Sequence, residues 1–259
     1  MLLMLSRRPC MGETLYQFIA ARFKQKFPDA DVDRAIAEYD EIPAFRASGN
    51  HPVSPEVHYV MRLTTQWHLQ EAFKAMKIDL DDPNVAEDLS TGNIGTAGRI
   101  AKVWCGATPG DDTELGGGRW SEAPRIATFP NETGISLPIT KRVNLISNCS
   151  HHFVPFSTDF SDDSQVVISY IPKSVVLGIS KLQRLVNWVG QRFWLQEDLT
   201  RELYNVVSEA ARTEDVYIRL ENIKHGCEFL RGARTKDGAF TSVYYRGKFA
   251  NEDIRKLVS

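Results

Sequence analysis

The sequence predicts an α+β protein in which two helices cover one face of an antiparallel sheet. Its 259 residues are 42% hydrophobic and 25% charged, which is ordinary for a globular chain with enough apolar material for a core. In the second half, apolar patterns follow one another in the order strand, strand, helix, helix, strand, strand. That order places both helices on the same face of a four-stranded antiparallel sheet.

The first part of the chain, residues 1–105, is predicted to be a helical region. Apolar residues recur there at helical spacing, and Pro28 marks the end of the first periodic stretch. We read His58 and His68, both on the longest helix, as packing or surface residues rather than metal ligands. The predicted helices cover residues 13–27, 31–39, 55–77 and 97–104.

Residues 106–134 form a turn-prone, Gly-rich segment that is predicted to be a flexible surface loop. Its run Gly116-Gly117-Gly118 is not a phosphate-binding loop, because no strand leads into it and no Lys-Ser or Lys-Thr pair follows.

Residues 135–259 carry the sheet and its two helices. The expected strands cover 135–147, 165–171, 216–221 and 242–249, and a short helix ends the chain. The two helices begin near Ser180, a candidate N-cap, and over residues 195–211. Four strands leave exposed sheet edges, and one chain lacks the strands to close a barrel. Subunits are therefore expected to close it together.

Composition predicts a soluble, cytoplasmic protein. A formal charge of −2 gives no global field for nucleic acid or an anionic membrane, so we expect neither as a partner. Four cysteines without regular spacing make no disulfide framework and fit a reducing compartment. The apolar start, residues 1–5, precedes Arg7 and Arg8, which is the wrong charge order for a secretory signal, and it is too short to span a bilayer.

Two short fragments carry the residues with metal and proton chemistry. Cys149 and His152 are three positions apart, and Cys227 offers a second thiolate. Two Cys and one His form a zinc set with three protein ligands, which leaves a fourth position for water, as in catalytic sites. His151 and His225 sit beside these ligands and remain for proton transfer.

The competing interpretation is that these residues only pack in the core. Either fragment alone is a weak signal. The chain, however, has four Cys and six His, and five of these ten fall in the two fragments. Such a concentration favours a metal site more than either fragment alone does.

Several further motifs resemble those of the GTP cyclohydrolase I family, in that family's order. The stretch from Cys149 to Phe156 resembles its Cys-Glu-His-His-Phe/Leu-Val-Pro-Phe motif, and Arg231-Gly232 completes the last motif. Between them lie Ile171-Pro172-Lys173, Gly178-Ile179-Ser180-Lys181-Leu182-Gln183-Arg184, Leu195-Gln196-Glu197-Asp198-Leu199-Thr200 and His225-Gly226-Cys227. The resemblance runs from about Asp79 to the C-terminus.

The resemblance implies a role for each matching residue. Cys149, His152 and Cys227 would bind Zn²⁺, and His151 and His225 would be the catalytic histidines. Gln196 and Glu197 would hold the guanine of GTP, and the sugar and triphosphate would meet Ser180, Lys181, Arg184, Arg231 and Arg99. The implied fold of residues 135–259 is the tunnelling fold, whose subunits close a barrel and form a homo-oligomer, a decamer in the family.

The implied reaction is that of a hydrolase acting on the C–N bonds of a cyclic amidine. Zinc would supply hydroxide near neutral pH by lowering the pKa of its water to ~7, and this nucleophile would attack guanine C8. His225 is a candidate to protonate N7, and His151 to handle protons on water or ribose. C8 leaves as formate, and the product is 7,8-dihydroneopterin triphosphate.

The sequence departs from the family pattern at three places. Ser150 stands where the family has an acid, Thr96-Ala97-Gly98-Arg99 replaces a Thr-Pro-x-Arg pattern, and Phe193-Trp194 replaces a Pro-containing turn. A change beside a metal-bound water alters the rate and the metal affinity more than the fold. Two alternatives therefore stay open: a zinc-stabilised relative that binds a nucleotide or pterin without turnover, and an enzyme that stops at the ring-opened product.

Overall fold

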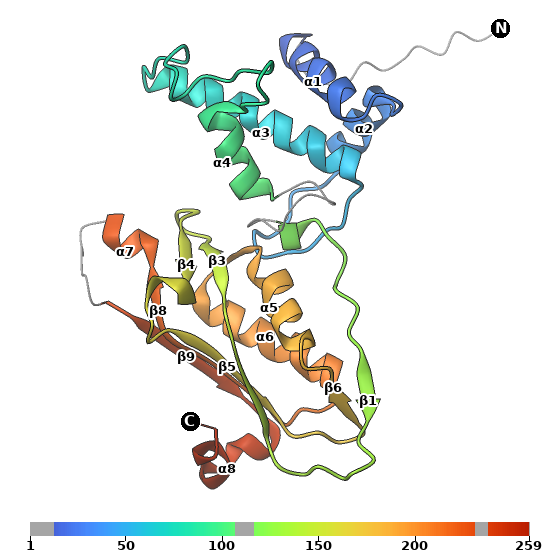
Figure 1. Ribbon diagram of the computed structural model, residues 1–259, viewed down its shortest axis with the longest axis vertical. Coiled ribbons are helices and arrows are strands. Elements are labelled where there is room, and N and C mark those ends of the chain that lie inside the picture. The colour runs from blue at the N-terminus through green and yellow to red at the C-terminus, as the bar shows by residue number, and fades with distance from the viewer. Residues whose placement is uncertain (1–12, 107–116, 231–237, 259) are drawn as a thin grey trace, which may run out of the picture. The chain divides into compact units, whose positions relative to one another are not determined.

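The computed structural model describes residues 13–106, 117–230 and 238–258, which form two compact units (Figure 1). Unit 1 comprises residues 1–46 and 51–121, and unit 2 comprises residues 47–50 and 122–259. The apolar start, residues 107–116 of the Gly-rich segment, and Arg231-Gly232 lie outside the described residues. None of the helices in the described ranges is long and apolar enough to cross a membrane.

Unit 1 is built from helices. Its helices are α1 (Glu13–Lys26), α2 (Val32–Asp40), α3 (Pro55–Ala75) and α4 (Gly95–Cys105), followed by a 3-10 turn, η1 (Gly117–Arg119). Side-chain caps begin two of them: Asp31 accepts from the Asp33 and Arg34 amides, and Ser54 accepts from Val57. Apolar side chains of α1, α2 and α3 form one core, which includes Ile19, Phe23, Ile36, Val60 and Leu63.

The two histidines of α3 behave as the sequence predicts. His58 is fully buried, and its Nε2 lies 2.7 Å from the Cys105 carbonyl oxygen. His68 is exposed on the same helix.

Unit 2 confirms the mixed α+β class with antiparallel strands. The principal sheet has the order β2 (Ile139–Val143), β5 (Gln165–Tyr170), β8 (Val216–His225), β9 (Phe240–Tyr245), with every neighbour antiparallel. Helices α5 (Lys181–Gly190) and α6 (Gln196–Ala211) cover one face (Figure 1). Leu185, Val189, Leu199 and Leu203 from these helices pack against sheet residues such as Ile218 in one hydrophobic core.

The strand predicted over residues 135–147 is in fact two strands. β2 ends at Val143, and β3 (Ile146–Cys149) begins after a break at Asn144 and Leu145. The break is stable because side chains satisfy its backbone: Gln183 bonds both the N–H and the C=O of Asn144, and the Leu145 amide donates to Thr158 Oγ1. Each half therefore pairs with a different partner strand.

A second group of short strands extends from the far end of β8. β3 pairs with β4 (Pro155–Ser157) and with β7 (Phe193–Trp194), and β4 pairs with the last residues of β8. β8 carries an irregularity in its pairing with β9 between Leu220 and Ile223, where Asn222 has a φ of 53°, and its last residues pair with β4. The long strand β8 thus connects the principal sheet to the strands that carry the Cys-His stretch.

The remaining elements of unit 2 lie at its margins. β1 (Thr128–Pro130) and β6 (Val175–Leu177) form a separate two-stranded sheet. The 3-10 turn η2 (Thr158–Phe160) follows β4, and α7 (Gly226–Leu230) follows β8 directly. After β9 come the 3-10 turn η3 (Gly247–Ala250) and the helix α8 (Glu252–Lys256). The last predicted strand, residues 242–249, is therefore displaced towards the N-terminus, because Gly247 adopts a φ of 62° and starts a turn.

Candidate metal and catalytic site

A tight turn between β3 and β4 presents the first metal-ligating candidates. Cys149 ends β3, where its N–H donates to the Val154 carbonyl at 2.9 Å, and its own carbonyl accepts from the Phe153 amide at 2.8 Å. Phe153 closes the turn with a φ of 53°. This geometry leaves Cys149 only 5% exposed and places His151 and His152 at the exposed tip.

Strand pairing brings the second fragment to the same place. In the β4–β8 register, Phe156 lies opposite His225, so the chain enters α7 beside Pro155. A Cβ on Gly226 would lie 2.9 Å from the Pro155 carbonyl oxygen, which is closer than such atoms approach. Glycine at 226 therefore permits the close approach that carries Cys227 to Cys149.

The structure brings Cys149, His152 and Cys227 together as one group. Their ligand atoms all lie within 4.8 Å of one another, although Cys149 and Cys227 are far apart in the sequence. Cys149 is buried, Cys227 is partly buried and His152 is exposed, so one side of the group faces solvent. Two sulfurs and one imidazole nitrogen form a donor set that suits a metal with an open position.

Without a metal, the thiol of Cys149 affects the pKa of Cys227. Burial raises the pKa of Cys227, and the neighbouring Cys149 raises it further through charge repulsion and a hydrogen bond. A bound cation reverses this balance, because a coordinating thiol loses its proton.

His225 is held beside this group by two kinds of contact. Its ring stacks on Phe156, with centroids 4.6 Å apart and planes inclined by 12°, and its Nε2 lies 2.7 Å from Gln196 Oε1. Burial lowers the pKa of His225, while the nearby carboxylates of Glu228 and Glu197 act in the opposite direction. The imidazole of His225 therefore favours its neutral form, and the two carboxylates interact with it electrostatically.

The first turn of α6 supplies two predicted substrate residues in different settings. Gln196 is 2% exposed, whereas Glu197 is exposed. Glu197 directly follows Gln196, whose Oε1 lies 2.7 Å from His225 Nε2, and its charge opposes the lowering of the His225 pKa. The two residues predicted to contact guanine thus lie at the start of α6, next to the Cys-His-Cys group.

The predicted phosphate-binding residues lie on α5 and elsewhere. Ser180 occupies the N-cap position but makes no side-chain cap hydrogen bond, and Lys181 and Arg184 follow on the first turn. Arg99 lies on α4 of unit 1, where its Nη2 donates to Asn93 Oδ1 at 2.7 Å. Arg231 lies outside the described residues.

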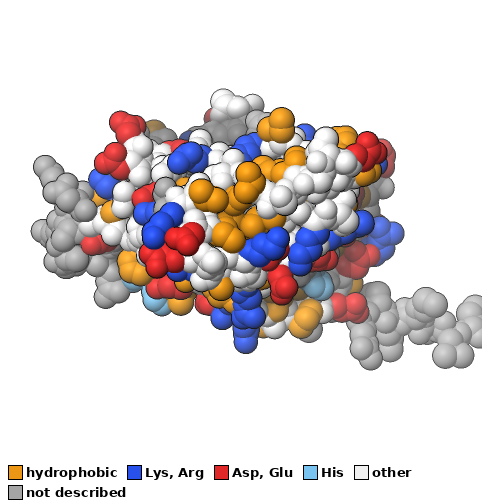
Figure 2. Space-filling view, turned by 90° about the horizontal axis from the view of Figure 1, so that it is seen from below, with side chains coloured by type: hydrophobic (Ala, Val, Ile, Leu, Met, Phe, Trp, Pro, Cys, Tyr) orange, Lys and Arg blue, Asp and Glu red, His pale blue; other side chains and the backbone are white. Residues whose placement is uncertain are grey.

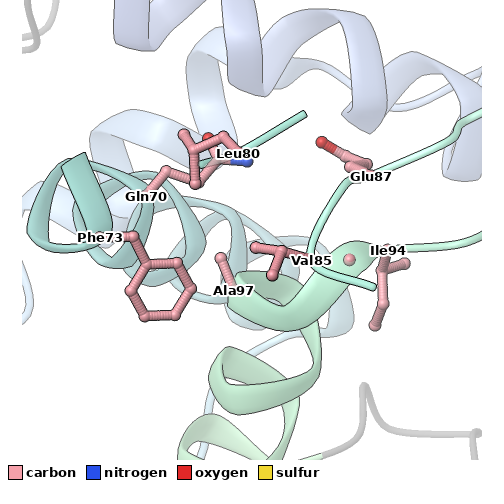
Figure 3. Close-up of a pocket in the computed structure, with 8 residues that line it drawn as sticks. Gln70, Phe73, Leu80, Val85, Glu87, Ile94 and Ala97 are labelled. Atoms are coloured by element: carbon pink, nitrogen blue, oxygen red, sulfur yellow. The ribbon is translucent and has the colours of Figure 1, made fainter. Parts of the chain in front are cut away.

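Unit 1 has a small cavity of its own. Figure 3 shows Gln70, Phe73, Leu80, Val85, Glu87, Ile94 and Ala97 around it, and Gly95 also contributes. Its volume of about 20 Å³ is enough for a water molecule but not for a nucleotide. The cavity therefore offers no second substrate site.

Sequence reasoning missed the partners that hold the candidate residues. Phe156 stacks on His225, the Phe240 carbonyl and Ser242 bind Gln196, and Lys141 Nζ bonds the Ile179 carbonyl just before α5. These partners come from other strands, so spacing along the chain carries no signal for them. The β4–β8 register is the one feature from which the Phe156–His225 pair follows.

Fold and site together define an α+β protein whose Cys-His-Cys group has further histidines beside it, which is more than a closed structural metal site requires. The profile of the GTP cyclohydrolase I family matches residues 72–258, and the chain belongs to this family.

Curated relatives agree with this assignment. The chain is 29% identical over 203 residues to GTP cyclohydrolase 1 of Citrobacter koseri, covering 76% of this chain and 82% of that protein. It is 30% identical over 183 residues to GTP cyclohydrolase 1 of Serratia proteamaculans, covering 70% and 73%. Among solved structures, an apo archaeosine synthase QueF-Like matches with a TM-score of 0.32 and 20% identity, over 42% of this chain and 93% of that one, a likeness too low to carry an argument.

Proposed function

We propose that the protein is a zinc-dependent GTP cyclohydrolase I, which hydrolyses GTP at guanine C8, releases formate and yields 7,8-dihydroneopterin triphosphate. The observation that carries this proposal is the convergence of Cys149, His152 and Cys227 in a chain of this family. His151 and His225, which a purely structural metal does not need, favour turnover over simple binding.

The donor group fits zinc. In a tetrahedral site with bonds of about 2.0–2.3 Å, ligand atoms lie ~3.3–3.8 Å apart, so atoms already within 4.8 Å need only small side-chain rotations. Zinc held there would supply a nucleophile near neutral pH, because it lowers the pKa of its bound water to ~7. Thiol ligands require a reducing compartment, which fits a cytoplasmic enzyme.

The protein side chains divide the remaining tasks. His225 donates a proton to N7 as C8 becomes tetrahedral, and the exposed His151 handles protons on water or ribose. Glu197 accepts from the guanine N1–H and 2-amino group, which lie side by side on one edge. The cationic Lys181, Arg184, Arg231 and Arg99, with Ser180, hold the sugar and triphosphate.

The fold supports assembly into a larger barrel. Among the described strands, β2 pairs only with β5, and β9 only with β8, so both edges of the principal sheet are open. Exposed hydrophobic side chains of unit 2 include Phe129, Leu137 and Leu257, and Figure 2 shows hydrophobic side chains gathered between charged ones on the face seen from below. We propose a tunnelling fold closed between subunits, with a homodecamer as the assembly.

The decisive experiment incubates the purified, zinc-loaded protein with GTP and measures formate together with the fluorescence of the oxidised pterin. Both products are expected in equal amounts. Formate without pterin would instead identify an enzyme that stops at the ring-opened product. Bound zinc and nucleotide without formate would identify a non-catalytic relative.

A matched variant tests the metal centre. Cys227→Ser removes one thiolate, and we expect zinc content to fall well below one per chain, with loss of formate release. Cys105→Ser, which changes a buried cysteine of unit 1 outside the group, should keep its zinc. Full, tightly held zinc in Cys227→Ser would remove Cys227 from the site.

A further inference from the structure

One residue of the turn between β3 and β4 has a backbone conformation that its side chain does not favour. Phe153 has a φ of 53°, in the left-handed region that glycine and asparagine enter readily and that a bulky side chain rarely adopts. Such a conformation persists only where the surroundings hold it, and such residues concentrate at functional sites. Phe153 directly follows His152, the exposed member of the Cys-His-Cys group.

Backbone hydrogen bonds fix both ends of this turn. The Cys149 N–H donates to the Val154 carbonyl at 2.9 Å, and the Phe153 N–H donates to the Cys149 carbonyl at 2.8 Å. From β7, the Trp194 carbonyl accepts from the Ser150 N–H at 3.0 Å. The left-handed backbone of Phe153 is part of the path between these bonds. A contact that stabilises it therefore also fixes the place of the residue before it.

The side chain of Phe153 makes such a contact. Its ring lies against the ring of Phe193, with centroids 4.4 Å apart and planes inclined by 50°. Phe193 is 7% exposed and belongs to β7, where it lies opposite Asn148 in the pairing with β3. Phe193 is thus anchored in the sheet, and an aromatic pair at this distance is stabilising beyond the area that it buries.

Neither the backbone nor burial accounts for a phenylalanine at position 153. Glycine would adopt this φ without strain, and the Phe153 side chain is still 40% exposed. The ring supplies one thing that glycine cannot, which is the contact with Phe193. The family resemblance does not supply this contact, because Phe193-Trp194 replaces a Pro-containing turn of the family pattern.

We infer that the Phe153–Phe193 pair is a clasp that positions His152, so that the three donors are assembled before a metal ion binds. The inference rests on the proposed function, because it takes Cys149, His152 and Cys227 as the metal centre. Their ligand atoms already lie within 4.8 Å of one another. A donor set held in place in this way binds more tightly, since less ordering is needed on binding. Phe153 and Phe193 act through His152 and are positioning residues.

Zinc affinity, measured by competition with a chromogenic chelator, tests the clasp from both sides. Phe193→Leu keeps an apolar side chain but removes the ring. Phe153→Asn keeps a residue that tolerates the left-handed backbone but also removes the ring. Each should weaken zinc binding by ~10-fold or more, as is typical when groups that orient metal ligands are lost. Phe153→Tyr, which retains the ring, should keep the affinity of the unmodified protein.

A matched control removes an aromatic contact elsewhere in unit 2. Phe249 is fully buried, and its ring centroid lies 5.8 Å from that of Tyr217. Phe249→Leu makes the same chemical change as Phe193→Leu near η3. It should lower Tm while leaving the zinc affinity of the folded protein unchanged.

Co²⁺ bound in place of zinc separates positioning from a general loss of stability. Its visible absorption bands depend on the atoms that coordinate it and on their geometry. At equal occupancy, Phe193→Leu and Phe153→Asn should give weaker and shifted bands, because His152 is no longer held, whereas Phe249→Leu should give the bands of the unmodified protein. The double variant of Phe153 and Phe193 should lose no more zinc affinity than the weaker-binding single variant, since the two rings act as one unit.

Three results would overturn the inference: unchanged zinc affinity and Co²⁺ bands in Phe193→Leu, losses that add in the double variant, or a Phe153→Tyr protein that binds zinc as weakly as Phe153→Asn. All of these measurements are made without GTP. A protein that binds zinc but releases no formate would contradict the proposed function, while its metal affinities would still decide whether the clasp positions His152.

Discussion

At the scale of single residues, a structural role can be separated from a chemical one by experiment, and Glu197 is an example. An acid in the first turn of a helix is favoured by the helix dipole, whatever its function. Glu197 is nevertheless exposed and lies within electrostatic reach of His225, where a carboxylate can accept two hydrogen bonds from guanine.

We expect Glu197→Gln to keep zinc and fold but to lower kcat/KM for GTP by at least ~10²-fold, or ~2.7 kcal/mol of transition-state stabilisation. Inosine triphosphate, which keeps N1–H but lacks the amino group, should be a poor substrate of the unmodified protein. The control is Asp198→Asn, which alters the adjacent first-turn acid, paired with Arg201 at 2.8 Å, and should change kcat/KM less than twofold. Equal losses of kcat/KM in Glu197→Gln and Asp198→Asn would show that Glu197 only stabilises the helix.

A buried histidine makes unit 1 sensitive to acid. Burial lowers the pKa of His58 below its usual 6.5, against the opposing effect of its hydrogen bond to the Cys105 carbonyl. Below pH ~6.5 the unfolded chain therefore binds a proton that the folded unit resists, so the stability that His58 contributes is lost as pH falls, by at most ~1.4 kcal/mol per pH unit.

Thermal unfolding at pH 7.5 and pH 5.5 tests this effect. The substitution His58→Gln keeps a donor near the Cys105 carbonyl without a titrating ring, and it should reduce the fall in Tm between the two pH values. His68→Gln, at the exposed histidine of the same helix, should leave that fall unchanged. An unchanged pH dependence in His58→Gln would assign the acid sensitivity to other groups.

At the scale of elements, α7 begins where no side chain can be accommodated. Gly226→Ala would place a Cβ 2.9 Å from the Pro155 carbonyl oxygen and 2.7 Å from Val154 Cγ1. The backbone must shift, and Cys227 moves with it. We therefore expect zinc affinity to fall by ~10-fold or more, comparable to the loss caused by disturbing residues around a metal site.

A second glycine provides the control for this substitution. Gly247→Ala also creates a clash, with Asp215, and forces an alanine into a φ of 62°, but it does so near η3. It should lower Tm while leaving the zinc affinity of the folded protein intact. Competition with a chromogenic chelator measures that affinity in both variants. Similar zinc affinities in Gly226→Ala and Gly247→Ala would show that strain at residue 226 does not displace the metal-ligating atoms.

The sequence was sufficient for the order of the main helices and of the four principal strands, but not for the short strands or for the way the strands pair. Apolar periodicity located α1 to α6 and the four principal strands, because burial of one face imposes that pattern. It merged β2 and β3, since the break at Asn144 and Leu145 depends on Gln183 and Thr158 from elsewhere in the chain. Local sequence patterns carry no information about such long-range hydrogen bonds.

The same limit applies to the site. The spacing of Cys149 and His152 and the later Cys227 was enough to predict the donor group that the structure assembles. The setting of Gln196 was not predictable, because Phe240 and Ser242 reach it from β9 across the sheet. The roles of the individual substrate residues stay predictions.

At the scale of the whole molecule, the open edges of the principal sheet predict self-association. We expect light scattering at assay concentration to give a multiple of the 29.3 kDa chain mass. Val243→Lys places a charge on the edge strand β9, where Val243 is 43% exposed, and should shift the protein towards smaller species. Leu89→Lys, at a residue of unit 1 that is 46% exposed, should keep the mass of the unmodified protein. An active monomer would contradict the proposed assembly.

The position of Cys227 after β8 also has a consequence for metal binding while the chain is being synthesised. Cys149 and His152 are synthesised first, but the last donor follows only after β5, α5, α6 and β8 have been made. A nascent or truncated chain that ends before β8 holds two donors at most and would release its metal readily, because metal affinity depends on the complete ligand set. Retention of zinc would therefore indicate that unit 2 has been synthesised and that its strands have paired. A cell that removes loosely held zinc would remove it from incomplete chains first.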